Sequence, residues 1–119
     1  TRYAWGDEIG HNRANCNDCG SQWDGKSTAP VGSFAPNAFG LHDLHGNVGE
    51  WVEDCWHHSY RGAPSDGTAW TAGDCGKRVL RGGSWAVWFK AVLSARRDFI
   101  RPGFRSHTIG FRVARTLTP

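Results

Sequence analysis

The sequence has no methionine, no long apolar run and no low-complexity tract. A membrane-spanning helix needs about 20 consecutive apolar residues, so the short apolar runs argue against a membrane as partner, and no basic-then-apolar leader opens the chain. A chain without methionine does not start at its own initiator, so we expect a processed product or a piece of a longer protein. With 119 residues and 39% hydrophobic content, we expect a single domain over 1–119.

Charge is distributed unevenly along the chain, although the formal net charge is only +3. Residues 1–60 carry three basic and eight acidic side chains, whereas residues 61–119 carry eleven basic and three acidic ones. A basic half suggests nucleic-acid binding, but its arginines are scattered among aromatic and turn residues instead of lining one helix face. We therefore do not expect nucleic acid as a partner.

Glycine and proline interrupt the chain every few residues, which excludes long helices. One short helix is predicted over 47–55, because Val48, Trp51, Val52 and Cys55 recur at helical spacing. Strands are predicted over 78–80, 92–97 and 111–114. A chain so poor in regular structure must satisfy its backbone polar groups by other means, such as side chains, disulfides or metal ions.

Three motifs follow one another in order: NAFGLHDLHGNVGEW at 37–51, RGGSW at 81–85 and IGFRVA at 109–114. Together they resemble the formylglycine-generating enzyme (sulfatase-modifying factor) family. The resemblance implies an α+β, C-type-lectin-like fold with short strands, few helices and much irregular structure. It also implies that the chain is the C-terminal part of a longer domain of this kind.

Calcium is the cofactor that the resemblance implies, bound by hard oxygen ligands in the loops. The first site would use the Asp43 and Glu50 carboxylates with the backbone carbonyls of Gly46 and Val48. The second would use the side chains of Asn15 and Asp24 with the carbonyls of Cys16 and Lys26. Alternatively, Asp43 and Glu50 cap turns or pair with arginines of the basic half.

Two departures from the family pattern bear on chemistry. The tryptophan of the family's GNVWEW is Gly49 here, so local packing must differ and a neighbour or a partner could fill the space. The resemblance also implies two copper-binding cysteines three and eight residues after the serine of GGS, and these places hold Val87 and Val92. Valine cannot ligate copper, so the enzyme's own reaction is not expected.

The four cysteines allow more than one arrangement. Cys16 and Cys19 form a C-x-x-C pair, and we favour Cys55 and Cys75 meeting across their loop as a disulfide or as a reduced buried pair. A four-cysteine zinc site is an alternative. Histidines near acidic residues leave an iron site as a further alternative to hydrogen-bonded loop histidines; they are His42, His45, His57 and His58.

The segment from Ala86 to Thr108 carries apolar and aromatic residues between the family's usual scaffold residues. This pattern resembles the variable proteins of diversity-generating retroelements, in which constant residues hold the backbone and variable side chains bind a ligand. The expected ligand-binding residues are Ala86, Val87, Trp88, Phe89, Lys90, Arg96, Phe99, Ile100, Arg101, Phe104, Ser106, His107 and Thr108. Alternatively, the aromatic residues complete a small core or pack on the missing part of the domain.

The sequence thus predicts a noncatalytic ligand-binding domain, stabilised by calcium, whose partner is a protein or another surface ligand. The alternative is a divergent oxidoreductase of the same family, or an accessory subsite domain of a larger enzyme. A regulatory or structural module of a larger signalling protein is a third hypothesis.

Overall fold

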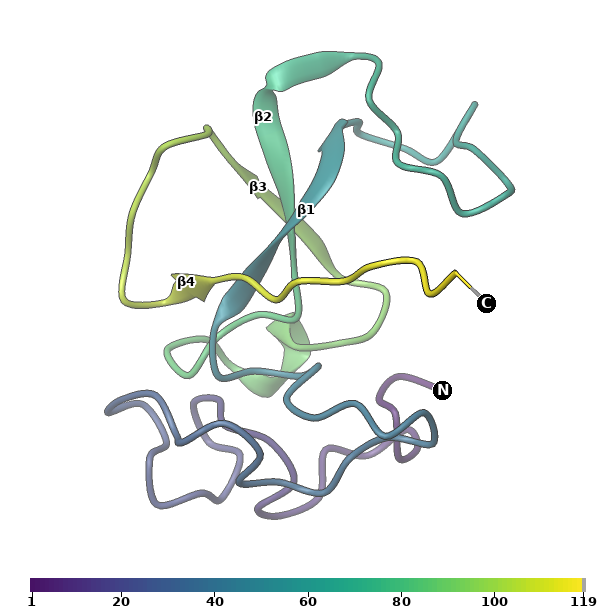
Figure 1. Ribbon diagram of the computed structural model, residues 1–119. Helices are drawn as coiled ribbons and strands as arrows, with labels where there is room; N and C mark the ends of the chain where they lie inside the picture. The colour runs from purple at the N-terminus through teal and green to yellow at the C-terminus, as the bar shows by residue number, and fades with distance from the viewer. Residues whose placement is uncertain (119) are drawn as a thin grey trace.

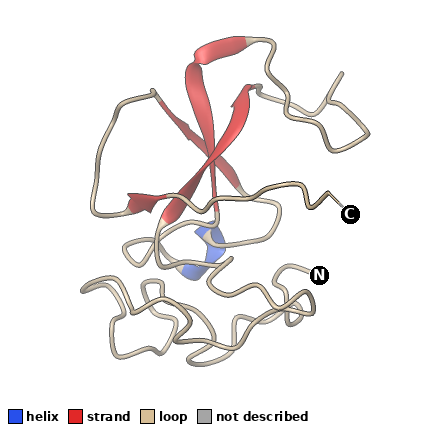
Figure 2. Ribbon diagram, viewed as in Figure 1, coloured by secondary structure: helices blue, strands red, loops and turns tan. Residues whose placement is uncertain are grey.

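A computed structural model describes residues 1–118. Over this range the chain forms four strands and one 3-10 helix: β1 (Gly49–Trp56), β2 (Asp74–Arg81), η1 (Phe89–Ala91), β3 (Arg97–Ile100) and β4 (Ile109–Gly110). Loops and turns make up the rest of the chain (Figure 2). The C-type-lectin-like expectation of short strands, few helices and much irregular backbone is confirmed. No helix within 1–118 has the length and apolar character that a membrane crossing requires.

The strands form a twisted sheet in the order β3-β2-β1-β4 (Figure 1). β2 runs antiparallel to both β1 and β3, whereas β4 runs parallel to β1. The parallel pair aligns Gly49 with Ile109 and Glu50 with Gly110. This register brings the 37–51 motif beside the C-terminal motif, which are far apart in the sequence.

The helix predicted over 47–55 is wrong, because these residues lead into and form most of β1. Gly46 and Asn47 have φ angles of 76° and 67°, a left-handed conformation that cannot start a right-handed helix. Trp51 then pairs with Leu80 of β2. Aromatic and β-branched residues favour a strand once a partner strand is present, and that partner lies more than twenty residues away.

The strand predicted over 78–80 lies within β2, but those over 92–97 and 111–114 are wrong. After η1 the chain turns, with the Arg96 N–H donating to the Leu93 carbonyl at 3.0 Å. The Arg81 guanidinium donates hydrogen bonds to the Ser94 and Arg96 carbonyls at 3.0 and 2.7 Å. These two carbonyls are therefore already bonded to a side chain and do not pair with a neighbouring strand. At the C-terminus, β4 ends at Gly110.

A hydrophobic cluster lies where the N-terminal loops meet η1, and its buried members are Tyr3, Cys16, Cys19 and Val92. The Tyr3 hydroxyl donates to the Phe89 carbonyl at 3.2 Å, and burial raises the pKa of Tyr3. His45 is also buried: its Nδ1 lies 2.7 Å from the Val92 carbonyl oxygen, and its Nε2 accepts the Ala4 N–H at 3.0 Å. These contacts fasten the N-terminal loops to the segment around η1.

Candidate functional site

Glu50 and Arg112 meet because β4 runs alongside the start of β1. The Arg112 Nε donates to one Glu50 carboxylate oxygen at 2.6 Å, and a terminal nitrogen of the guanidinium donates to the other. The same guanidinium donates to the carbonyls of His42 and Asp43 at 2.8 and 3.1 Å. Hydrogen bonding to Glu50 raises the pKa of Arg112 above its usual value. This is the arginine pairing that the sequence leaves open as the alternative to calcium.

The Asp43 carboxylate has one satisfied and one unsatisfied oxygen. Oδ2 accepts the Gly32 N–H at 2.7 Å, whereas the buried Oδ1 has no hydrogen-bond partner within residues 1–118. A buried carboxylate oxygen without a partner is costly, and a hard cation is one group that would satisfy it. A pocket of about 460 Å³ adjoins Asp43, Val48 and Glu50. Asp43 therefore fits the first predicted calcium site, while Glu50 fits it only by sharing its carboxylate with Arg112.

Asn15 and Asp24 of the second predicted site converge on one point. The Ser21 hydroxyl oxygen lies 3.1 Å from Asn15 Oδ1 and 2.9 Å from Asp24 Oδ1. Asn15 is fully buried, so its oxygen is held in a fixed position. Cys16 follows Asn15 directly, and Lys26 lies in the turn after Asp24, where its N–H donates to the Trp23 carbonyl at 3.0 Å.

The two side-chain oxygens of this second site are of the kind that calcium prefers, but in this structure the Ser21 hydroxyl occupies the point that they face. Within residues 1–118, no three or more His, Cys, Asp and Glu side chains gather into a group that could hold a metal. The first predicted calcium site depends instead on two carboxylates and two backbone carbonyls, and the second on one asparagine, one carboxylate and two backbone carbonyls.

The two positions expected to carry copper thiols lie in the core. Val92 is fully buried in the hydrophobic cluster, and Val87 packs against the same cluster. Their neighbours Cys16 and Cys19 are joined as a disulfide, with 5.3 Å between their Cα atoms. The place expected to hold a metal is thus filled by aliphatic side chains and a disulfide.

The other two cysteines, Cys55 and Cys75, form a disulfide with an S–S distance of 1.97 Å. This bond joins the end of β1 to the start of β2. Within residues 1–118 no cysteine remains as a free thiol, so the four-cysteine zinc alternative has no thiolates to draw on.

The predicted ligand-binding segment divides by exposure. Val87 and Phe89 turn toward the hydrophobic cluster, as the core alternative expects. Trp88, Phe99 and Phe104 remain 59%, 44% and 43% exposed. Of the remaining residues, Ala86, Lys90, Arg96, Arg101 and His107 are exposed, and Ile100, Ser106 and Thr108 are half-buried.

The structure brings some of these residues together and separates others. Val87, Arg96 and Thr108 line one small hollow of about 160 Å³. Phe99 lies elsewhere on the sheet, with its ring 4.6 Å from that of Trp56. The segment therefore does not form one continuous aromatic face.

Sequence reasoning missed an aromatic and cationic cluster beside Phe99. The Arg97 guanidinium lies 4.9 Å from the Trp56 ring centre and 4.2 Å from that of Tyr60. Trp56 and Tyr60 lie at and after the end of β1, outside the segment that the sequence singles out. Their aromatic character was the available signal, but only the folded sheet shows that they face Arg97.

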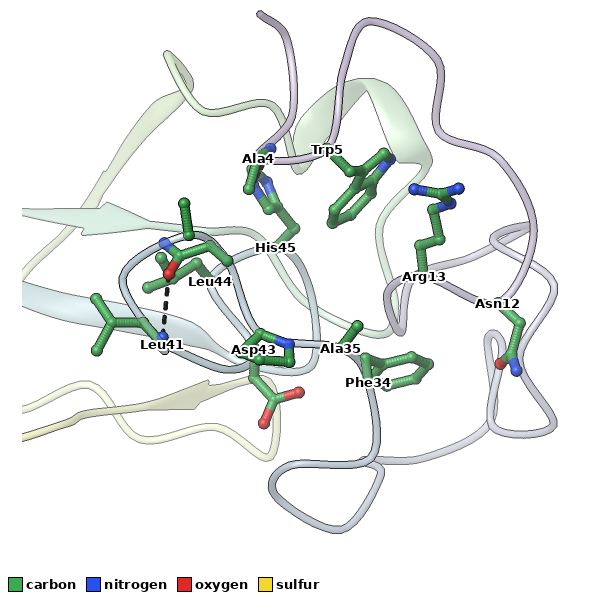
Figure 3. A pocket seen from close by; sticks show the side chains of 13 residues that line it. Ala4, Trp5, Asn12, Arg13, Phe34, Ala35, Leu41, Asp43, Leu44 and His45 are labelled. Atoms are coloured by element: carbon green, nitrogen blue, oxygen red, sulfur yellow. Dashed lines mark hydrogen bonds between the residues drawn. The ribbon is translucent and has the colours of Figure 1, made fainter.

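A second feature that the sequence missed is a pocket of about 400 Å³ among the N-terminal loops (Figure 3). Trp5 and Phe34 lie on its walls, and Arg13 extends beside Trp5. His45 also lines it, but both ring nitrogens are already hydrogen-bonded. An apolar lining with a few polar groups is typical of small-molecule sites.

Comparisons with known proteins identify the scaffold that carries these residues. The formylglycine-generating enzyme of Streptomyces coelicolor is 35% identical, covering 95% of this chain and 40% of that protein. The structure of PvdO from Pseudomonas aeruginosa has a TM-score of 0.78 at 44% identity, covering 87% of this chain and 38% of that one. Treponema denticola variable protein 1 has a TM-score of 0.69 at 34% identity, covering 84% and 34%.

The chain spans less than half the length of each of these proteins. A family model described as the sulfatase-modifying factor enzyme 1-like domain matches residues 1–117. The chain therefore belongs to the formylglycine-generating enzyme (sulfatase-modifying factor) family.

Proposed function

We propose that this chain is a noncatalytic ligand-binding domain on the formylglycine-generating enzyme scaffold, with residues 86–108 as its binding segment. The observation that carries the proposal is that this segment buries aliphatic side chains and leaves aromatic side chains exposed. Val87 and Val92, at the expected thiol positions, are packed inward, whereas Trp88 and Phe104 are left exposed. Exposed aromatic residues on a fixed backbone provide much contact area at low ordering cost.

The likeness to Treponema denticola variable protein 1 supports this proposal, since variability requires a scaffold that tolerates changes in its exposed side chains. In this chain the backbone of the segment is held by groups outside its variable positions. Arg81 holds the Ser94 and Arg96 carbonyls, and the Arg2 carbonyl accepts the Ser94 N–H at 2.8 Å. Substitutions at Trp88 or Phe104 leave all of these bonds in place.

The catalytic half of the proposal is tested by adding copper(I) to the protein with its two native disulfides intact, and measuring bound copper and oxygen consumption with ascorbate as the reductant. The wild type should bind no stoichiometric copper at the Val87 and Val92 positions. The V87C/V92C variant, which returns thiols to both places, should bind it. Stoichiometric copper or iron in the wild type, with oxygen consumption above buffer, would overturn the noncatalytic assignment in favour of an oxidoreductase.

The binding half is tested by selecting a displayed random peptide library on the wild-type domain and measuring the recovered peptides against variants. Binding should fall at least tenfold in W88A and F104A and should persist in the control Y60A, an exposed aromatic outside the segment. Equal binding by all variants would exclude the segment as the binding surface. Diversification by a retroelement further predicts a nearby template repeat in the gene that differs at adenines.

We also propose calcium as the structural ion, supported by the convergence of Asn15 and Asp24 and by the unpartnered Asp43 oxygen. Metal analysis should find calcium, and a chelator should lower the melting temperature. The D24N variant should lose the part of the chelator effect that comes from the second site, whereas D66N, which changes an exposed loop carboxylate, should retain the full effect. A melting temperature that does not respond to the chelator in the wild type would refute calcium binding.

A further inference from the structure

A glycine that the backbone does not require lies beside a hollow in the sheet. Gly49 opens β1 with ordinary strand geometry, whereas most glycines of this chain have positive φ angles. A Cβ built at Gly49 would meet the Thr108 carbonyl oxygen at 3.6 Å and the Gly83 carbonyl oxygen at 4.0 Å, which are ordinary contacts. The backbone therefore accepts a side chain at this buried position, which lines the hollow.

The hollow beside Gly49 has a volume of about 160 Å³. Its walls include Leu80, Val87 and Ile109, and the backbone of Gly82 and Gly83 forms a surface without side chains. For comparison, a protein cavity of about 150 Å³ lined by apolar residues holds a benzene molecule. The hollow is open on one side, but its volume is sufficient for one aromatic ring, and its lining combines these apolar residues with the polar Ser84, Arg96, Asp98 and Thr108.

The polar groups of the hollow also suit an aromatic ring. Arg96 lines the hollow and is oriented by a bidentate contact with Asp98, at 3.0 and 3.3 Å. A guanidinium held in place near an aromatic face contributes a cation–π attraction.

We propose that the hollow beside Gly49 is an anchor pocket that accepts one aromatic side chain of a protein ligand. This inference rests on the proposed function, because Val87, Arg96 and Thr108 of the binding segment line the pocket. It identifies where the ligand is held: in a pocket at the start of β1 instead of on the exposed aromatic residues alone. Buried aromatic anchors in pockets of this kind commonly dominate the affinity of protein interfaces.

The test uses 5-fluoroindole as a probe, observed by ¹⁹F NMR with the whole chain. The wild type should broaden and shift the fluorine signal in a saturable way. G49W should weaken binding at least tenfold, because the introduced indole fills the pocket. G76W is the matched control, since Gly76 is an exposed strand glycine on β2 away from the hollow, and it should bind as the wild type does.

A second variant keeps the test informative if G49W fails to fold. G49V adds a smaller side chain at the base of the pocket and should weaken binding to a lesser degree. The proposal is overturned if the wild type does not bind 5-fluoroindole saturably, or if G49W and G49V bind it as tightly as G76W. The display selection separates the two proposals. If its peptides depend on Trp88 but bind G49W as tightly as the wild type, the anchor pocket is refuted and the proposed function is retained.

Discussion

Replacing Arg112 by glutamine should destabilise the fold, because one guanidinium joins the C-terminal segment to β1 and to the preceding loop. The change removes two bonds to the Glu50 carboxylate and those to the His42 and Asp43 carbonyls. A hydrogen bond to a charged group contributes about 1.5–3 kcal/mol when sheltered. The Arg112 side chain is 38% exposed, however, so solvent screening reduces its share. We expect a total loss of about 2 kcal/mol for R112Q, or about 8 °C in melting temperature.

Urea and thermal unfolding of R112Q, E50Q and the double variant in chelator form a double-mutant cycle. The coupling between Glu50 and Arg112 should be about 1–2 kcal/mol, whereas R115Q, which changes an exposed arginine nearby, should have little effect. In excess calcium the coupling should be smaller, because the Glu50 carboxylate cannot bind a calcium ion and keep both of its hydrogen bonds to Arg112 at full strength. A loss below about 0.5 kcal/mol in R112Q, with no coupling, would refute the structural role of this ion pair.

Three further changes test other parts of the structure. Replacing Cys55 and Cys75 by alanine should cost about 3 kcal/mol in urea unfolding, because their disulfide closes a loop with a sequence separation of 20; an unchanged midpoint would argue against the bond. V92A should cost about 2–3 kcal/mol, since it removes two methyl groups from a fully buried site, and a loss near zero would mean that Val92 is not in the core. Hydrogen bonds from Thr68 lower the pKa of Asp66, so their contribution is present above the unfolded pKa and is lost as the pH falls through the folded one. T68V should therefore raise the Asp66 pKa toward its usual value in carboxyl ¹³C NMR, and an unchanged titration would contradict this contact.

The motifs were sufficient to predict the family, the irregular fold and the loss of the two thiols. Those features depend on residue identity and local spacing, which the sequence displays directly. The left-handed conformations at Gly46 and Asn47 are also local, since glycine and asparagine adopt them more readily than other residues do. The calcium ligand sets and the ligand-binding residues remain predictions that the proposed experiments test.

Tertiary structure alone decided the features that depend on distant partners. Residues 47–55 have apolar side chains at helical spacing, but pairing with β2 made most of them a strand. Glu50 met Arg112 only because β4 lies parallel to β1. The hollow at Gly49 is likewise formed by segments from β1, β2, the 82–98 region and β4. The physical reason is that contacts between strands and across cavities form between residues many positions apart, and no local pattern specifies which of them will meet.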